Sequence, residues 1–171
     1  MTIVETTGSA QEQINEMRKI EEDKRLVATE SLLKELQYNH DVVASYIQHT
    51  EEGANVRKPG VYSWEWNTPQ FGAYERYLPV ISRGDLEFSR KIASLYSQLE
   101  SCKTIVLYIH QLLAGNALEK YIITNGHLLL EQEVKKYNSQ LYDVSKNIKN
   151  SFDEPITKLS NIIGLTKQPM V

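Results

Sequence analysis

The stretch RGDLEFSRKIASLYSQLESCKTIVLYIHQLLAG, residues 83–115, decides the fold class. Its apolar side chains recur at alternating spacings of four and three residues, which places them on one stripe of a helix that packs against other helices. Ser82 and Asp85 resemble a capping box, and Gly115 is a typical C-terminal stop. The stripe consists of Phe88, Ile92, Leu95, Leu99, Cys102, Val106, Ile109 and Leu113, widened by Leu86, Tyr96, Ile105 and Leu112.

Two further stripes with the same spacing lie on either side of this helix. The first predicts a helix from about residue 10 to 52 and contains Leu26, Thr29, Leu33, Leu36, His40, Val43 and Ile47. The second predicts a helix that begins near Asn116 and contains Leu130, Val134, Tyr137, Leu141, Val144 and Ile148. Since only Gly115 and Asn116 would separate this helix from the preceding one, the two should form an antiparallel hairpin.

A short fourth helix is predicted after Ser151, with Glu154 at the capping position, Pro155 in the first turn and Gly164 at the end. Its apolar side would be Ile156, Leu159, Ile162 and Ile163, and it should close one end of the bundle. The sequence therefore predicts an all-α fold, an antiparallel bundle of three long helices plus short helices. We expect a flexible N-terminus over 1–8, one helical-bundle domain over 9–165 and a tail over 166–171.

Residues 9–25 form a charged helical extension in which only Ile14, Met17 and Ile20 are large and apolar. A helix with so little to bury is either a solvated helix start or a stalk, coiled-coil-like, that pairs with another chain or leads from an anchor.

The segment 53–81 is a long aromatic crossover between the first two long helices. Alternation over residues 62–66 would place three rings on one face of a strand, and Thr68 with Pro69 is typical of a helix start. The rings either fold back and cover the bundle or form a surface for a partner, because Trp and Tyr dominate interaction hot spots. The candidate interaction residues are Tyr62, Trp64, Trp66, Phe71, Tyr74 and Tyr77.

No catalytic constellation, cofactor motif or metal-ligand pattern is found in the sequence. A di-iron bundle needs Glu-x-x-His pairs, and none of the four histidines has a carboxylate three residues before it,. His40 lies on the first stripe, where we expect a hydrogen bond inside the bundle, with Asn39 nearby; its functional alternative is ligand contact. Cys102, the single cysteine, is expected to be a small buried hydrophobe.

Charge and hydropathy narrow the class of partner. A net charge of −3 argues against nucleic-acid binding, which normally needs a basic surface,. The first residues lack the basic start and apolar stretch of a signal peptide, and no apolar run is long enough to cross a bilayer. We therefore expect a cytoplasmic protein without direct membrane insertion in this chain; tethering through an anchor upstream of it stays open.

Three segments resemble a group of uncharacterised prokaryotic helical-bundle proteins. These segments are LLKELQYN at 32–39, the aromatic turn from Trp66 through Tyr74, and LYSQLE at 95–100. Members of that group often carry a membrane helix before such a domain, so the resemblance implies that the charged extension could lead from an anchor. It implies no activity and no catalytic residues.

Together these patterns favour a non-enzymatic protein-interaction or scaffold module that self-associates through its N-terminal helix. The alternative is a small-molecule-sensing helical bundle, with a ligand bound near His40 and the aromatic crossover.

Overall fold

The computed structural model describes residues 3–55, 68–81, 85–113 and 126–166. All regular secondary structure in these ranges is helical, which confirms the predicted all-α class. The helices are α1 (Ile3–Asn55), α2 (Gly72–Ile81), α3 (Leu86–Leu113), α5 (Gly126–Lys149) and α6 (Asp153–Thr166), with a 3₁₀ turn, η2 (Asn150–Phe152), between the last two. None of the described helices has a stretch long and apolar enough to cross a membrane.

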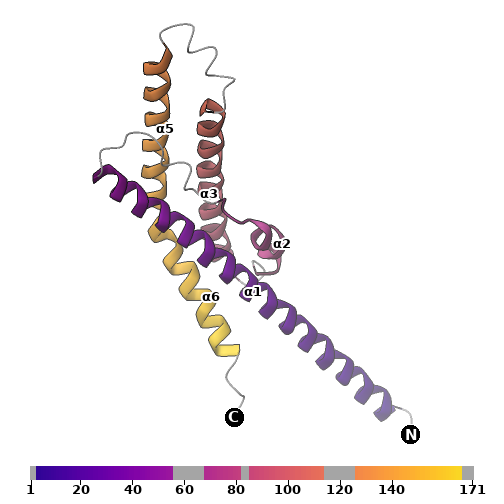
Figure 1. Cartoon of the computed structure of the whole chain (residues 1–171). Coiled ribbons are helices and arrows are strands. Elements are labelled where there is room, and N and C mark those ends of the chain that lie inside the picture. The colour runs from indigo at the N-terminus through magenta and orange to yellow at the C-terminus, as the bar shows by residue number, and fades with distance from the viewer. Residues whose placement is uncertain (1–2, 56–67, 82–84, 114–125, 167–171) are drawn as a thin grey trace.

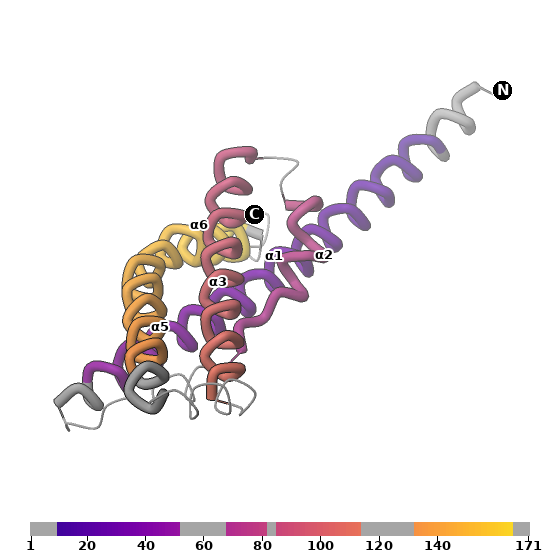
Figure 2. The backbone as a smooth tube through the Cα atoms, turned by 90° about the horizontal axis from the view of Figure 1, so that it is seen from above, coloured from indigo at the N-terminus to yellow at the C-terminus, as the bar shows by residue number. Residues whose placement is uncertain are grey.

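Helix α1 is the element around which the others are arranged. Figure 1 shows it as a long diagonal that crosses α3, α5 and α6 and projects far beyond them at its N-terminal end. Seen from above, in Figure 2, α1 and α3 run in the same general direction and α5 runs back against α3. Helix α1 packs against α2, α5 and α6, while α3 and α5 pack against each other.

The stripe predicted for α3 is confirmed almost residue for residue. Seven of its eight members are buried, from Phe88 to Ile109, and Leu113 is half-buried. Of the residues expected to widen it, Tyr96 and Leu112 are buried and Ile105 is half-buried. Leu86 was expected in the core, but its side chain is 64% exposed. It is the first residue of the helix, where the chain has not yet reached the packed layer.

The start of α3 is capped by Asp85, which the predicted capping box placed three residues after the cap. The Phe88 amide donates to Asp85 Oδ1 at 2.9 Å, which makes Asp85 the residue just outside the helix,. Ser82 lies outside the described residues. Lys158 of α6 donates to the other carboxylate oxygen of Asp85, so the cap also ties α6 to α3.

The Asp85 cap should make stability depend on pH. The Lys158 ammonium and the Phe88 amide hold the pKa of the Asp85 carboxyl below its ordinary value. Because the folded-state pKa is depressed, the contribution is present above the ordinary Asp pKa of about 3.9 and is lost as pH falls through the lowered value. We expect Asp85→Asn to flatten the acid side of a plot of urea midpoint against pH. An unchanged acid slope would contradict this role.

In α1 the buried line is displaced to one side of the predicted stripe. Four members of the stripe are buried as expected, Thr29, Leu36, Val43 and Ile47. The other three, Leu26, Leu33 and His40, are only half-buried. The centre of the buried face is Ala28, Leu32, Glu35, Asn39, Val42 and Tyr46, again at spacings of four and three. Two polar members hid this line from hydrophobic periodicity. Helix α1 also spans more than the predicted 10–52.

Helix α5 shows the same displacement. Val134, Leu141 and Ile148 are buried as predicted, but Asn138 and Ser145 are buried in place of Tyr137 and Val144, which are half-buried. Small polar side chains at these positions allow a close approach to the neighbouring helices. The helix start predicted near Asn116, and with it the two-residue hairpin, lies outside the described residues.

Helices α5 and α6 form one bent path rather than a helix followed by a separate end cap. Lys149 and Asp153 on either side of η2 keep helical backbone angles. Pro155 sits in the first turn of α6, as predicted, where its missing N–H cannot bond the carbonyl of Ser151 and favours a bend,. Leu159 is buried, and α6 packs along α1 instead of closing the bundle end. The helix continues past Gly164, which was expected to end it.

Candidate functional site

Three distant segments of the chain meet around one buried carboxylate, that of Glu35. Residues 35–39 come from α1, residues 68–74 from the turn that enters α2, and Tyr96 from α3. These are the three segments on which the resemblance described above was based. We call this group the Glu35 cluster, and define it as Glu35, Tyr38, Asn39, Thr68, Gln70, Ala73, Tyr74 and Tyr96.

Glu35 caps α2 from another helix. Its Oε2 accepts the Ala73 amide at 2.6 Å, and its Oε1 accepts the Tyr74 amide at 2.9 Å and the Tyr96 hydroxyl at 2.6 Å. The first amides of a helix have no partner within the helix and carry its positive dipole end, so a carboxylate satisfies both needs. Thr68 was predicted as this cap, with Pro69 as the first helical residue. Instead, α2 begins at Gly72 and its cap lies 37 residues earlier in the sequence.

Asn39 and Tyr38 hold the turn before α2. Asn39 Oδ1 accepts the Gln70 amide at 2.7 Å and its Nδ2 donates to the Gln70 carbonyl at 2.8 Å, so one side chain pairs with both backbone groups of one residue. The Tyr38 hydroxyl reaches the Thr68 carbonyl at 3.5 Å. Gln70 bonds Asn39 of α1, whereas Tyr74, four residues later, bonds Glu35, four residues earlier in α1. Helix α2 therefore runs antiparallel to α1.

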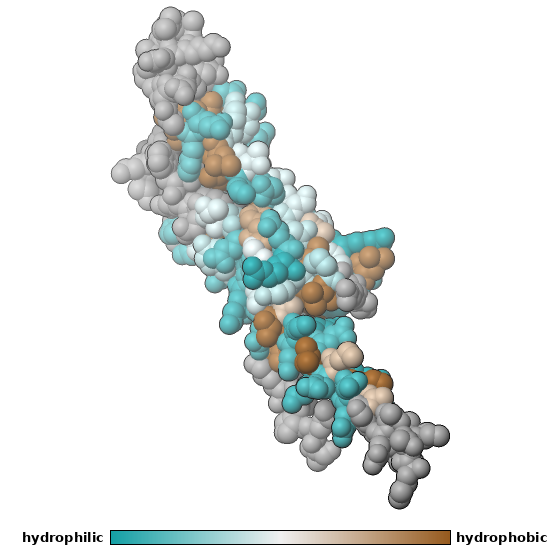
Figure 3. All heavy atoms as spheres, turned by 90° about the vertical axis from the view of Figure 1, so that its right-hand side faces the viewer, coloured by the Kyte–Doolittle hydropathy of each residue, from teal (hydrophilic) through white to brown (hydrophobic). Residues whose placement is uncertain are grey.

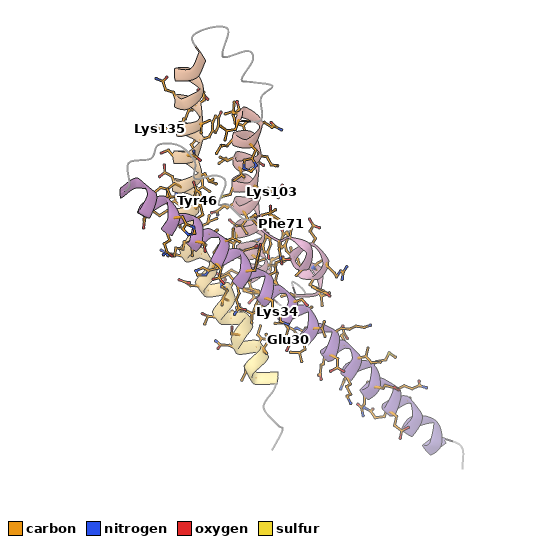
Figure 4. The ribbon with its side chains drawn as sticks, viewed as in Figure 1. Glu30, Lys34, Tyr46, Phe71, Lys103 and Lys135 are labelled. Atoms are coloured by element: carbon orange, nitrogen blue, oxygen red, sulfur yellow. The ribbon has the colours of Figure 1, made fainter. Side chains whose placement is uncertain are left out.

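The aromatic side chains of α2 pack onto Tyr96. The Tyr74 ring stacks on it with centroids 4.0 Å apart, and the Phe71 ring meets it edge-on at 5.7 Å. Lys103 Nζ lies 5.0 Å from the Phe71 ring centre, and Figure 4 shows these two side chains close together between α3 and α2. Burial and the Glu35 carboxylate raise the pKa of Tyr96, so its hydroxyl keeps its proton and donates.

The candidate interaction residues divide into two groups. Phe71, Tyr74 and Tyr77 are half-buried and pack against the core, which favours the alternative that they fold back and cover one side of the bundle. Tyr62, Trp64 and Trp66, with the strand predicted for them, lie outside the described residues.

His40 lies on the side of α1 that contacts η2. Its side chain is 29% exposed, its Nδ1 lies 3.3 Å from Asp41 Oδ1, and its ring meets Phe152 edge-on at 5.6 Å. The expected pairing with Asn39 is wrong, because Asn39 bonds Gln70 on another face of the helix. A cavity of about 250 Å³ lies between α3, η2 and α6, and His40 does not line it. Its walls are Lys91, Ser94, Leu95, Gln98, Asn150, Ser151, Glu154 and Pro155.

Burial keeps the Cys102 thiol and the Tyr46 hydroxyl in their neutral forms at neutral pH. Cys102 is fully buried, as predicted, and burial raises the pKa of its thiol to about 11. A thiol in this state is a poor nucleophile at neutral pH. Burial likewise raises the pKa of Tyr46 to about 12, and its hydroxyl donates to the Asn138 carbonyl at 3.4 Å. Within the described ranges, no three His, Cys, Asp or Glu side chains are grouped to bind a metal.

No family model, curated protein or solved structure gives a match to the chain. The function must therefore be inferred from the geometry of the chain.

The part of α1 that projects beyond the other helices is the second candidate site. Every residue from Ala10 to Arg25 is exposed, including Ile14 at 44%, Met17 at 65% and Ile20 at 47%. Figure 3 views the molecule from the side on which α2 lies, and apolar atoms are interspersed among hydrophilic ones along its lower part. We call residues 10–25 the α1 extension.

Sequence reasoning left Glu35 out of the predicted stripe and considered Asn39 only as a neighbour of His40, because both residues are polar and the stripe was drawn mainly through apolar residues. One signal could have revealed them. They continue the spacing of four and three set by Ala28 and Leu32, in phase with Val42 and Tyr46. A polar residue in phase with such a stripe indicates a buried group with a specific partner.

Proposed function

We propose that this chain is a non-enzymatic protein-interaction module that self-associates through the α1 extension. The bundle, fastened by the Glu35 cluster, serves as a rigid base from which the extension projects. The observation that carries the proposal is the full exposure of residues 10–25, with three large apolar side chains among them.

Exposed apolar side chains on a projecting helix are a feature of association surfaces. A single exposed Leu or Ile is ordinary, but Ile14, Met17 and Ile20 follow one another at helical spacing on one side of the extension,. Most helical stability in proteins comes from packing of an apolar face, and residues 10–25 are all exposed, so pairing with another helix would stabilise the extension,. The neutral thiol of Cys102 and the structural use of Glu35 support a role outside catalysis.

We place the module in the cytoplasm, tethered or free. The single cysteine, which can form no internal disulfide, fits a reducing compartment,. A membrane anchor preceding the extension is compatible with this proposal, because the extension would then lead from the anchor to the bundle.

Self-association is tested with a triple variant of the full chain, Ile14→Gln, Met17→Gln and Ile20→Gln. Glutamine is a good helix former, so the helix should persist while the apolar surface is lost. We expect sedimentation equilibrium to show a monomer–dimer equilibrium for the natural sequence and a monomer for the variant, with at least a tenfold weaker association.

A second triple variant, Leu86→Gln, Leu107→Gln and Leu165→Gln, removes the same number of exposed apolar side chains from the body of the molecule. It should associate like the natural sequence. A natural chain that stays monomeric, or an extension variant that dimerises as well as this control, would contradict the proposal.

A further inference from the structure

The exposed apolar face of the α1 extension is the same face on which α2 docks. Met17 and Ile20 precede Glu35 and Tyr38 by 18 residues, which is about five turns at 3.6 residues per turn,. Glu35 and Tyr38 both hold the segment that leads into α2. On this side of α1, Ala28, Leu32 and Glu35 are buried, whereas residues 10–25 are exposed. An antiparallel helix thus covers one part of this face and leaves the part before it uncovered.

We propose that the uncovered part is filled by the α1 extension of a second copy, antiparallel to the first and in line with α2. This inference rests on the proposed self-association and adds its partner segment and its orientation. Ala10, Ile14, Met17 and Glu21 follow the spacing of four, three and four that an antiparallel helix pair uses,. The two-fold axis would place Ile14 opposite Met17 of the second copy, and Ala10 opposite Glu21 of the second copy.

The charges of the extension favour the antiparallel orientation. Residues 10–17 carry two acidic and no basic side chains, whereas residues 18–25 carry four basic and three acidic ones. In the antiparallel register, residues 10–13 of each copy, which carry one acidic and no basic side chain, lie beside residues 18–21 of the other, which carry two basic side chains and one acidic one. A parallel pair would set the two acidic halves side by side.

The position of α2 favours the same orientation. Two-fold pairing in a parallel sense would bring both bundles to the same end, with two copies of α2 competing for the space beside the paired face. The antiparallel pair places the bundles at opposite ends, beyond the paired helices. The molecule would then be a symmetric dimer with two rigid heads on a shared rod. Since one pair of short helices buries less than the ~1,200 Å² typical of stable complexes, we expect a Kd in the micromolar range.

Crosslinking of two single-cysteine substitutions in the full chain tests the orientation. One protein carries Ala10→Cys and the other Glu21→Cys; both positions are exposed, and Cys102 is buried and should not react. In the antiparallel pair the two new thiols face each other, while like positions are about 16 Å apart along the axis at 1.5 Å per residue. In a parallel pair, like positions would face each other, and positions 10 and 21 would be about 16 Å apart along the axis.

We expect a short crosslinker with two thiol-reactive maleimide groups to join the two proteins in a mixture, and to leave each protein alone uncoupled. Coupling within each protein alone, or no coupling in a sample that sedimentation shows to be dimeric, would overturn the antiparallel assignment and leave the proposed self-association in place. A chain that remains monomeric in sedimentation would contradict both.

Discussion

Replacing Glu35 with alanine is expected to lower the free energy of unfolding by about 3 to 4 kcal/mol, because it leaves two amides and a hydroxyl without their acceptor in a buried place. The groups concerned are the amides of Ala73 and Tyr74 and the hydroxyl of Tyr96. Alanine is at least as good a helix former as glutamate, so helix propensity in α1 cannot account for the loss. Urea denaturation followed by circular dichroism measures it, with Glu16→Ala in the exposed extension as the matched control.

A second readout separates release of α2 from general weakening. The amides of Ala73 and Tyr74 should exchange with deuterium much faster in Glu35→Ala, whereas the middle of α3 should change only as far as global stability requires. The stability of Glu35→Gln should lie between those of the natural sequence and Glu35→Ala. The glutamine side chain keeps one acceptor oxygen, but its NH₂ group would face the remaining donors. If Glu35→Ala were as stable as Glu16→Ala, the carboxylate would not be the anchor of α2.

Replacing Asn138 with leucine is expected to stabilise the protein by about 1 to 3 kcal/mol. The residue is 8% exposed, and neither polar atom of its side chain has a hydrogen-bond partner among the described residues. Leucine has the same number and branching of heavy atoms, so it removes the unpaired amide with little change in shape. For a chain of this size the midpoint of thermal unfolding should rise by roughly 2 to 4 °C per kcal/mol.

The matched control for Asn138→Leu is Asn161→Leu, on the exposed side of α6, where we expect a change within about 0.5 kcal/mol,. A loss of stability in Asn138→Leu would show that the amide is satisfied by a buried water or that the site is too tight for a methyl pair. A gain would show that the buried, unpaired amide of Asn138 lowers the stability of the natural sequence.

Periodicity predicted the helices well where apolar residues alone form the buried face. In α3 the pattern from Phe88 to Ile109 identified the core, because each of these side chains is buried for its hydrophobicity and needs no specific partner. In α1 and α5 the predicted stripe lay to one side of the buried face that the structure shows. Glu35, Asn39, Asn138 and Ser145 are polar residues in buried positions, and a rule that assigns polar residues to solvent turns the helix the wrong way.

The helix caps were likewise predictable only where the capping residue is local in the sequence. Asp85 is a local cap, and its type and place beside an apolar stripe were visible in the sequence even though the box was assigned to the wrong register. The cap of α2 is not local, since Glu35 precedes it by more than thirty residues and belongs to another helix. The sequence offered Thr68 and Pro69 as a reasonable local start, and a tertiary contact replaced it.

The pattern of residues 83–115 thus determined by itself that the protein is helical and that α3 is a buried element. The pattern of residues 9–25 determined that the chain before Leu26 has little to bury. These properties depend on the spacing of side chains along one helix. Only the tertiary structure decided which face of α1 is buried, where α2 begins and which face of the extension is left uncovered. Those properties depend on hydrogen bonds and contacts between residues far apart in the chain, and no periodicity within a single segment contains them.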